Sequence, residues 1–541
     1  MTTFSNFVDR VLPARILSRR TEILIVTLLS MACGAAYAFF AGQDVNWDWQ
    51  NYHDYDAFAL MHGRYRLDVA PAGIQTFINP FVYIPTYLLR HHLHPITAGL
   101  ILGAVHGLNI VLLWGISRAL LGRSAGWPLA LAATVVGATA PLTLSEVGTS
   151  FADLSTSILV LAGVWMLLGY RPSSWRIPVG AGCLIGAAVG LKLTNMCFAI
   201  GAIVLVLGSS EPVRQFIWFA AGGIAGAVLM AGPWAAYLFV EYRNPLFPYF
   251  NAIFRSSDGP PFNINDPRFL PKDLKDALKY PIYWLLGINR TAENPFRDGR
   301  FAVLEVLILT GAVLALLRRA RDWGRVAFTR TDLAFFGFYI GSFAIWMLQF
   351  SYQRYAIALE MLTGPAIVLF CIRLLPDRYL RAVTFGLAGF LVAWTQPPDW
   401  WHRPWSNPYL RSELPPELQA PATYFFLTKP LAFIWASSPR GSLFYGINDD
   451  HDLPINPGGE LDKRIREGLG TPLPAGDWAV ELKDQAMSCF SRGARRSAED
   501  CRRVIDLLKT YGLERDARRS CVTIPGVIFV DAIACPLRRA Q

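Results

Sequence analysis

The fold of this chain is decided by an apolar run at residues 96–117, which reads ITAGLILGAVHGLNIVLLWGIS and contains no Asp, Glu, Lys or Arg. A helix of about 20 apolar residues crosses the roughly 30 Å of hydrocarbon in a bilayer. Similar blocks recur as far as residue 396. The composition agrees, because 53% of the 541 residues are hydrophobic and only 17% are charged, against about 25% charged in soluble domains. The chain is therefore predicted to be a membrane protein.

Apolar blocks of this kind predict about eleven spans. They lie near residues 22–41, 96–117, 126–142, 154–170, 177–191, 195–208, 215–240, 301–317, 332–350, 355–374 and 382–396. We therefore expect an all-α polytopic transmembrane domain at 1–396, with outer loops at 43–95 and 243–300. Residues 397–541 lack such blocks. Strand-like 442–446 and helix-like 498–511 predict that they form a small extracytoplasmic α/β domain.

The orientation is predicted from arginines in short loops, because cytoplasmic loops carry an excess of Lys and Arg. With the N-terminus inside, every alternate loop is basic. The net charge of +10 is then a topology signal, and no nucleic-acid partner is expected. The pattern is typical of an integral protein of a bacterial inner (plasma) membrane, with a cytoplasmic N-terminus and a periplasmic C-terminal domain. The first run also resembles a signal peptide, with Ala-Tyr-Ala at 36–38 as its cleavage site; either interpretation leaves 43–95 outside.

Four cysteines fall in the part expected outside: Cys489, Cys501, Cys521 and Cys535. An oxidising compartment favours disulfides there. Four cysteines allow three pairings, and the sequence leaves all three open.

The first outer loop carries the principal catalytic candidate, Asp48. Asp48, Tyr52 and Tyr55 have helical spacing, so this stretch is predicted to be a short helix at the membrane face. Asp48 would lie near its N-terminus, where the helix dipole favours a carboxylate. Tyr52 and His53 are candidates for substrate binding. The structural alternative is a capping aspartate beside interfacial aromatic residues.

Two further acids lie in the next outer loop, at residues 145–153. Glu146 and Asp153 are second-tier catalytic candidates, because ionisable groups near the bilayer are costly unless they have a role or a partner. The alternative is that Asp153 caps the following helix.

Two cations are candidates for binding an anionic group on the same side. Lys192 lies between two unusually short apolar runs, which predicts a helix break lining a cavity. Arg354 runs against the positive-inside bias, and arginine forks bind phosphate. The alternatives are that Lys192 snorkels to the headgroups and that Arg354 pairs with Glu360 or Glu146. Tyr355 and Arg297 complete the substrate-binding candidates.

The Asp48-x-x-x-Tyr52 pattern in a long first outer loop, with the Ala57–Gly63 stretch after it, resembles the GT-C glycosyltransferases, polytopic enzymes that include protein O-mannosyltransferases and lipid A aminoarabinose transferases. The resemblance covers roughly the first 400 residues. It implies that Asp48 is the catalytic carboxylate and that outer Lys and Arg residues hold a lipid phosphate. It also implies a soluble domain after the last span.

The sequence departs from that family at Trp49, where many members carry a second acid. Metal use and acceptor class therefore stay open. Asp54 and Asp56 are lesser candidates for a divalent metal, since on a helix their side chains diverge, and no cofactor is otherwise expected.

The function expected is transfer of a sugar from a polyprenyl-phosphate donor to a hydroxyl of a glycan, lipid or protein acceptor, in contact with membrane lipids. The rivals are a transporter or flippase of lipid-linked sugars and a non-catalytic scaffold. A transporter should favour inverted repeats, which the sequence does not display.

Overall fold

The computed structural model describes residues 19–122, 126–169, 174–316, 328–407, 409, 413–447, 453–484, 488–490, 496–526 and 531–539. By its internal contacts the chain divides into two compact units. The first, which we call the helical unit, comprises Met1–Ala41, Gly99–Ala231 and Asp266–Trp400. The second, the mixed unit, comprises Gly42–Ala98, Gly232–Asn265 and Trp401–Gln541.

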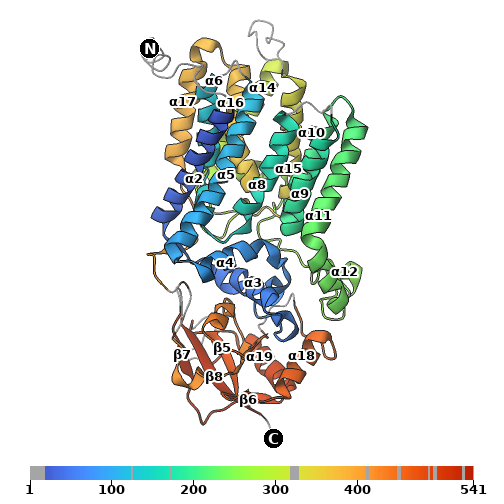
Figure 1. Cartoon of the computed structure of the whole chain (residues 1–541), viewed down its shortest axis with the longest axis vertical. Coiled ribbons are helices and arrows are strands. Elements are labelled where there is room, and N and C mark those ends of the chain that lie inside the picture. The colour runs from blue at the N-terminus through green and yellow to red at the C-terminus, as the bar shows by residue number, and fades with distance from the viewer. Residues whose placement is uncertain are drawn as a thin grey trace. The chain divides into compact units, whose positions relative to one another are not determined.

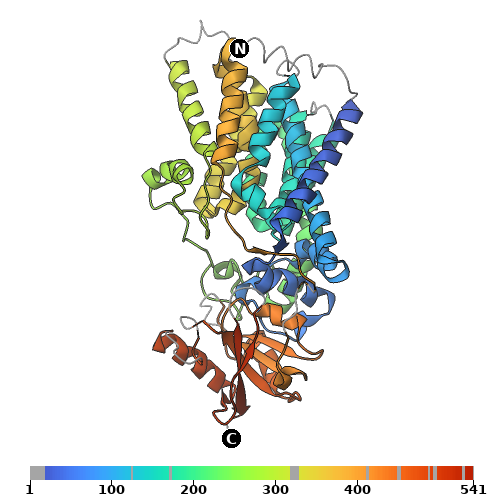
Figure 2. The same cartoon turned by 90° about the vertical axis from the view of Figure 1, so that its left-hand side faces the viewer.

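The helical unit is a bundle of long helices that run side by side (Figures 1 and 2). Its elements in chain order are α2 (Arg19–Ala41), α5 (Pro95–Leu121), α6 (Gly126–Ala138), α7 (Pro141–Glu146), α8 (Ala152–Gly169), α9 (Arg176–Leu191), η6 (Leu193–Asn195), α10 (Met196–Leu207), α11 (Pro212–Tyr242), α13 (Leu274–Leu286), α14 (Arg300–Leu316), α15 (Arg330–Gln349), η8 (Gln353–Ala356), α16 (Ile357–Leu374) and α17 (Asp377–Trp394). Two of these helices, α5 and α11, extend into the mixed unit, α5 with its first residues and α11 with its last turns.

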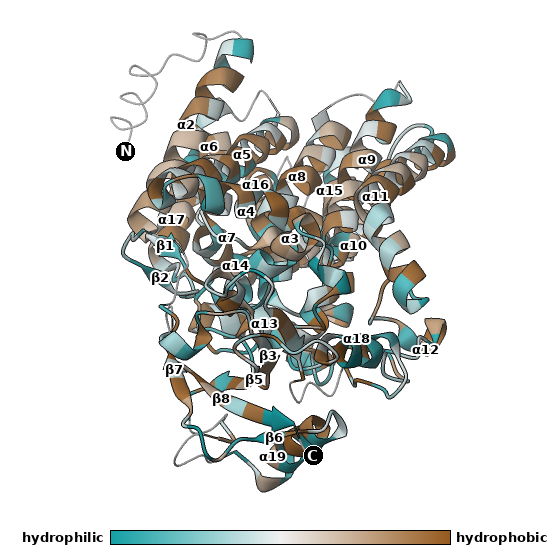
Figure 3. Cartoon of the chain, turned by 60° about the horizontal axis from the view of Figure 1, so that its bottom comes forward, coloured by the Kyte–Doolittle hydropathy of each residue, from teal (hydrophilic) through white to brown (hydrophobic). Residues whose placement is uncertain are grey.

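Each of the predicted spans overlaps a helix of this bundle, and among the residues that the structure describes six stretches are long and apolar enough to cross a membrane. They are Arg20–Ala41, Pro95–Leu121, Ala152–Gly169, Pro212–Tyr242, Arg330–Gln349 and Gln353–Leu374. Three shorter apolar helices follow the same pattern. Hydrophobic residues cover most of the bundle helices in Figure 3. The membrane fold is therefore confirmed, and the count of eleven crossings stays a prediction.

Close helix packing in the bundle depends on small residues. On α9, a Cβ at Gly182 would lie 2.1 Å from the carbonyl oxygen of Phe219, and one at Gly186 would lie 2.0 Å from that of Gly223. Glycines four residues apart let two helix backbones touch. Such contacts are common between membrane helices, because the hydrophobic effect does not drive helices together in lipid. The most enclosed of the candidate spans is Gln353–Leu374, which contains α16, since 89% of its most apolar part is buried.

The mixed unit begins with short helices built from residues 43–98. They are η1 (Trp49–His53), α3 (Asp54–Met61), η2 (Arg64–Arg66), η3 (Gly73–Phe77), η4 (Pro80–Tyr83) and α4 (Ile84–His92), followed later in the chain by α12 (Asn251–Phe254). The two-residue strands β1 (Gln43–Asp44) and β2 (His402–Arg403) pair antiparallel. The predicted helix at 48–55 is confirmed, since η1 and α3 run through this stretch.

The remainder of the mixed unit is a six-stranded mixed sheet with helices, as the α/β prediction expected. The strands follow the order β4-β3-β5-β8-β6, with β7 also paired to β8. Its elements are η9 (Pro416–Leu418), β3 (Thr423–Phe426), η10 (Ala432–Ala436), β4 (Leu443–Gly446), α18 (Glu460–Leu469), β5 (Asp477–Leu482), α19 (Ala498–Thr510), β6 (Leu513–Arg515), β7 (Val522–Ile524) and β8 (Ala532–Arg539). β3 is parallel to β4 and β5, whereas β8 is antiparallel to its neighbours.

The segment after η2 covers the edge of this sheet at β4. Val69 forms a parallel bridge with Tyr445, and Asp68 accepts the backbone N–H of Phe444 at 3.0 Å. A Cβ at Gly446 would lie 1.9 Å from the carbonyl oxygen of Ala70, so only glycine admits this approach. An uncovered edge strand is a site for unwanted pairing. The first-loop segment and the C-terminal sheet therefore belong to one folded body.

The four cysteines predicted to form disulfides do so, and the structure resolves which pairing is used: Cys489 with Cys501 and Cys521 with Cys535. The Cys521–Cys535 bond closes a loop of 14 residues in sequence separation. A cross-link of this length stabilises a fold by about 3 kcal/mol, mainly by restricting the unfolded chain.

The double variant Cys521→Ser/Cys535→Ser is accordingly expected to lower the free energy of unfolding of the sheet by about 3 kcal/mol. Denaturant titration followed by the fluorescence of the tryptophans, among them buried Trp478, measures this. The control is Cys33→Ser, because Cys33 is a free, exposed cysteine on α2. Equal midpoints for the double variant and the control would contradict the expectation.

Candidate active site

The helical unit gathers an acid–cation cluster from four separate segments. Its members are Glu146 at the end of α7, Asp153 in the first turn of α8, Lys192 between α9 and η6, and Arg354 with Tyr355 in η8. The Lys192 Nζ donates to Asp153 Oδ2 at 2.6 Å and lies 4.8 Å from the centre of the Tyr355 ring. The predicted helix break at Lys192 is confirmed, because α9 ends at Leu191 and Lys192 has an extended backbone.

Arg354 is held among aromatic rings in this cluster. Its guanidinium carbon lies 4.9 Å from the ring centre of Phe151 and 5.5 Å from that of Tyr355. The negative faces of aromatic rings attract a cation. The N–H groups of the guanidinium lie in its plane, so they stay available to another ligand. Tyr352 stacks on Tyr355 with ring centres 5.0 Å apart. The rings thus fix the orientation of the guanidinium.

Glu146 is a fully buried member of the cluster. Its Oε2 accepts the backbone N–H of Leu154 at 3.1 Å, so this glutamate caps α8. Its Oε1 has no hydrogen-bond partner among the residues that the structure describes. Burial raises the pKa of Glu146 well above its usual range, and Asp153 raises it further, while Lys192 and Arg354 oppose the shift. Glu146 therefore lies next to both cations and the second acid of the cluster while its own carboxylate is fully buried.

Glu360, an alternative partner for Arg354, caps α7. It accepts the backbone N–H groups of Leu142 at 3.2 Å and Thr143 at 2.9 Å, where the helix dipole favours a carboxylate. Arg297 makes contacts away from the cluster: its guanidinium lies 5.3 Å from the ring centre of Trp394, and its backbone pairs with Gln396.

Asp48 belongs to the mixed unit, where it precedes the π-helical turn η1. The hydroxyl of Tyr52 donates to Asp48 Oδ2 at 3.3 Å, which is the pairing that the four-residue spacing suggests. The side chain of Asn46 accepts the N–H of Trp49 at 2.7 Å and so starts the turn. His53 stacks on Tyr83, with ring centres 4.3 Å apart. π-Helical turns cost stability and often occur at functional sites.

Sequence reasoning missed the support behind this turn, which is Arg90 on α4. Its Nη2 donates to Asp44 Oδ2 at 2.5 Å, and its guanidinium lies 4.5 Å from the ring of Trp49 and 4.7 Å from that of Tyr409. Arg90 is 6% exposed, so the pair is a buried one that holds geometry. No local pattern signals it, because Arg90 and Asp44 are 46 residues apart.

A second feature missed from sequence is Arg268, in the loop before α13. It donates to the hydroxyl of Tyr352 and pairs with Asp266 at 2.6 Å. That hydroxyl in turn donates to Asp266 at 3.1 Å. The loop therefore holds the ring that stacks on Tyr355.

The two lesser metal candidates, Asp54 and Asp56, have different surroundings. Asp54 lies 2.9 Å from His91 Nε2 and accepts Trp435 Nε1 at 3.2 Å. Asp56 is fully buried, and neither of its carboxylate oxygens has a hydrogen-bond partner within the described part of the chain. In that part, no group of three or more His, Cys, Asp or Glu side chains is arranged to hold a metal ion.

The isolation of Asp56 makes stability depend on pH. Burial raises its pKa well above its usual range, so the folded state holds a proton that the unfolded state loses near pH 4. Stability should be greatest below that pH and fall as pH rises through the raised pKa, by up to about 1.4 kcal/mol per pH unit. Asp56→Asn should make this fall of stability with pH shallower, because it removes one of the buried acids with a raised pKa.

Thermal melting of the purified chain between pH 5 and pH 9 measures this dependence. Asp506→Asn is the control, because Asp506 has an exposed side chain, and it should keep the wild-type slope. A wild-type slope in Asp56→Asn would show that another group titrates.

The cluster and the Asp48 turn supply two kinds of chemistry. A carboxylate such as Asp48 can take a proton from a hydroxyl, and oriented cations such as Arg354 and Lys192 can bind a phosphate. A proton acceptor and a phosphate ligand are the two functions that group transfer from a phosphate leaving group requires.

No family model and no curated protein matches the sequence. Among solved structures, the chain is similar to ArnT from Cupriavidus metallidurans bound to undecaprenyl phosphate, with 13% identity and a TM-score of 0.53. It is also similar to the apo state of ArnT, with 14% identity and a TM-score of 0.52. Each match covers 96% of this chain and 98% of that chain.

The chain is also similar to the arabinofuranosyltransferase AftD from Mycobacteria, with 16% identity over 97% of this chain and 40% of that chain and a TM-score of 0.45. The two ArnT matches extend over almost the whole of both chains. The sequence predicted a resemblance to the GT-C glycosyltransferases, and the similarity to the two ArnT structures confirms it for the fold. This chain has the GT-C fold.

Proposed function

We propose that this chain is a glycosyltransferase that moves a sugar from a polyprenyl-phosphate donor to an acceptor hydroxyl at the outer face of the membrane. The observation that carries the proposal is the acid–cation cluster, in which segments far apart in sequence bring Asp153, Lys192 and Arg354 together. Ionisable groups at the ends of membrane helices are costly, so their convergence favours a function.

Arg354 and Lys192 are the proposed ligands of the donor phosphate. The guanidinium of Arg354 is oriented by the rings of Phe151 and Tyr355, and such a fork can bind two phosphate oxygens at once. Lys192 is held by Asp153 at 2.6 Å. This ion pair keeps the ammonium in position before the donor binds. Both cations would then neutralise the charge that develops on the phosphate as it departs.

Asp48 is the proposed general base. The acceptor hydroxyl attacks the anomeric carbon of the donor sugar, the bond from that carbon to the phosphate oxygen breaks, and the hydroxyl proton passes to Asp48. The products are the glycosylated acceptor and polyprenyl phosphate. The hydroxyl of Tyr52, bonded to Asp48 Oδ2, orients the carboxylate. Asp153 and Glu146 are assigned the positioning of the cations and not the proton transfer.

The fold supports a polyprenyl-phosphate donor. One of the similar ArnT structures contains undecaprenyl phosphate, a polyprenyl phosphate of the kind that the proposed reaction would release. The reaction is assigned to the outer face because lipid-linked donors carry sugars to a side where nucleotide sugars are lacking. The arginines in alternate loops also predict that the long segments face outward.

The proposal is tested with purified chain in lipid nanodiscs and proteoliposomes. A polyprenyl-phosphate sugar labelled in the sugar is supplied, and the release of polyprenyl phosphate and the fate of the label are followed. Transfer or slow hydrolysis of the sugar is the expected result. Movement of intact donor across a proteoliposome membrane without cleavage would favour a flippase, and neither activity would favour a scaffold; both outcomes would overturn the proposal.

A further inference from the structure

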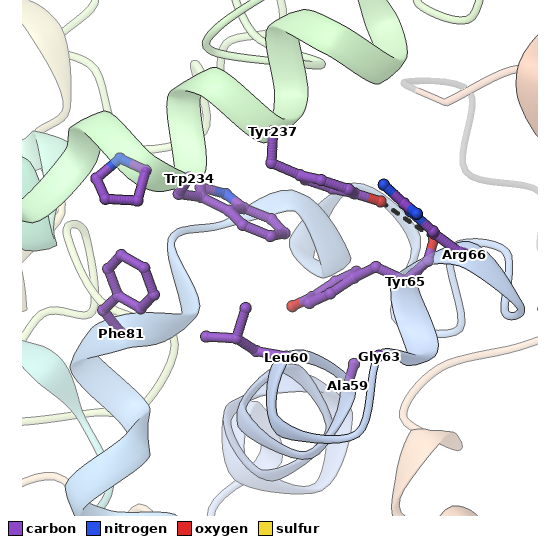
Figure 4. A pocket seen from close by; sticks show the side chains of 9 residues that line it. Ala59, Leu60, Gly63, Tyr65, Arg66, Phe81, Trp234 and Tyr237 are labelled. Atoms are coloured by element: carbon purple, nitrogen blue, oxygen red, sulfur yellow. Dashed lines mark hydrogen bonds between the residues drawn. The ribbon is translucent and has the colours of Figure 1, made fainter.

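The mixed unit contains a cavity of about 380 Å³ that the proposed reaction does not use. It lies between α3, η2 and the last turns of α11 (Figure 4). Pockets that bind small molecules in proteins usually have volumes of about 300–1,000 Å³. Most of its wall is aromatic or aliphatic, from Leu60, Tyr65, Phe81, Trp234 and Tyr237.

The polar groups of the aromatic residues in this wall are already bonded to the backbone. The hydroxyl of Tyr65 donates to the carbonyl of Asp56 at 3.1 Å, and that of Tyr237 donates to the carbonyl of Tyr65 at 3.2 Å. The indole N–H of Trp234 donates to the carbonyl of Phe77 at 3.0 Å. The rings therefore offer apolar surface to an occupant. Such a wall favours hydrocarbon over a sugar, which would need hydrogen-bond partners.

The position of the cavity along α11 identifies the source of that hydrocarbon. The helix has 31 residues, which at about 1.5 Å each exceeds the roughly 30 Å of bilayer hydrocarbon. Residues 216–240 carry no charge, and Trp234 and Tyr237 lie near the end of this stretch. Such aromatic residues concentrate at the boundary between hydrocarbon and headgroups. The cavity thus lies at the depth where lipid chains meet their headgroups.

The rim of the cavity carries a cation, Arg66, whose side chain is 76% exposed. Glu241 lies 3.8 Å from it, but that carboxylate is bonded more closely, at 2.5 Å, by Arg464 of α18. Arg66 can therefore bind an anionic lipid headgroup while the apolar chain of the same lipid occupies the cavity.

We propose that this cavity holds one acyl chain of an anionic phospholipid of the bilayer, with the lipid phosphate at Arg66. The cations assigned to the donor, Lys192 and Arg354, belong to the helical unit and have aromatic neighbours of their own. The cavity has a cation of its own, Arg66. We therefore assign a structural lipid, and not the sugar donor, to this cavity. This inference stands whether or not the chain transfers sugar.

The experiment uses the full chain in phosphatidylcholine nanodiscs that contain phosphatidylglycerol with a diazirine at the end of one acyl chain. After irradiation and digestion, label is expected in residues 59–66 and 233–237. Leu60→Trp, which fills the cavity, should lower this labelling by about tenfold or more. Leu88→Trp is the control, because Leu88 is exposed on α4 and does not line the cavity. Melting temperatures confirm that both variants fold.

Arg66→Gln separates the headgroup from the chain. It should abolish the preference for labelled phosphatidylglycerol over labelled phosphatidylcholine while labelling at the same residues continues. Three results would overturn the proposal: wild-type labelling in Leu60→Trp, label confined to exposed residues such as Val228 and Leu229 on α11, or displacement of the probe by polyprenyl phosphate but not by unlabelled phosphatidylglycerol. A separate transfer assay on the same samples distinguishes failure here from failure of the proposed enzyme activity.

Discussion

Asp48→Asn is expected to lower the rate of sugar transfer by about 10²–10⁴-fold, which is the usual contribution of a general base. Asparagine has nearly the same shape, and its amide oxygen can still accept the hydroxyl of Tyr52. The turn should therefore form as before, while the group that takes the acceptor proton is lost. The measurement is the initial rate of sugar transfer by purified protein, beside its melting temperature and its affinity for polyprenyl phosphate, both of which should be unchanged.

Two further variants sharpen this test. Tyr52→Phe removes only the hydroxyl that orients Asp48, so it should cost much less than Asp48→Asn. Asp153→Asn frees Lys192 from its ion pair, and it should weaken donor binding more than it slows transfer at saturating donor. If Asp48→Asn kept the wild-type rate while Asp153→Asn lost it at saturation, the base would be Asp153.

Arg354→Gln is expected to weaken the binding of polyprenyl phosphate by roughly ten- to a hundredfold, because a hydrogen bond to a charged group contributes about 1.5–3 kcal/mol. Arg354→Lys keeps the charge and loses the planar fork, so its affinity should be intermediate. Binding is measured by titration of the purified chain with polyprenyl phosphate. The affinity should fall more steeply with rising salt concentration in the wild type than in Arg354→Gln, since the variant has lost one of the two cations that bind the phosphate.

The matched control is Arg330→Gln, because Arg330 is exposed and donates to the carbonyl of Ser209. Arg297→Gln tests the remaining cation that the sequence suggested. Its contacts with Trp394 and Gln396 lead us to expect a small effect. Unchanged affinity in Arg354→Gln would remove this arginine from the donor site.

Local sequence patterns predicted much of the helical unit, because hydrophobic periodicity and helix breaks are properties of short segments. The apolar blocks mark the helices, and the break at Lys192 lies where two short runs meet. The span predicted at 126–142 runs past the end of α6 at Ala138. Its last residues begin α7, whose N-terminus is capped by Glu360, 218 residues away from Leu142. A cap so distant in sequence leaves no local signal.

The mixed unit was harder to predict for the same physical reason. The strand at β4 and the helix at α19 were recognised from their composition, but the bridge from Val69 to Tyr445 and the sandwich of Arg90 between Trp49 and Tyr409 join distant segments. The disulfide pairing likewise depends on the sheet, since β7 and β8 bring Cys521 close to Cys535.

A cryo-EM structure of the chain with bound polyprenyl phosphate tests the central claim most directly. We expect phosphate density in contact with the guanidinium of Arg354 and the ammonium of Lys192, with the carboxylate of Asp48 facing it across a space large enough for a sugar. Phosphate bound at other residues, or an Asp48 too distant to reach a hydroxyl that attacks the donor, would contradict the account.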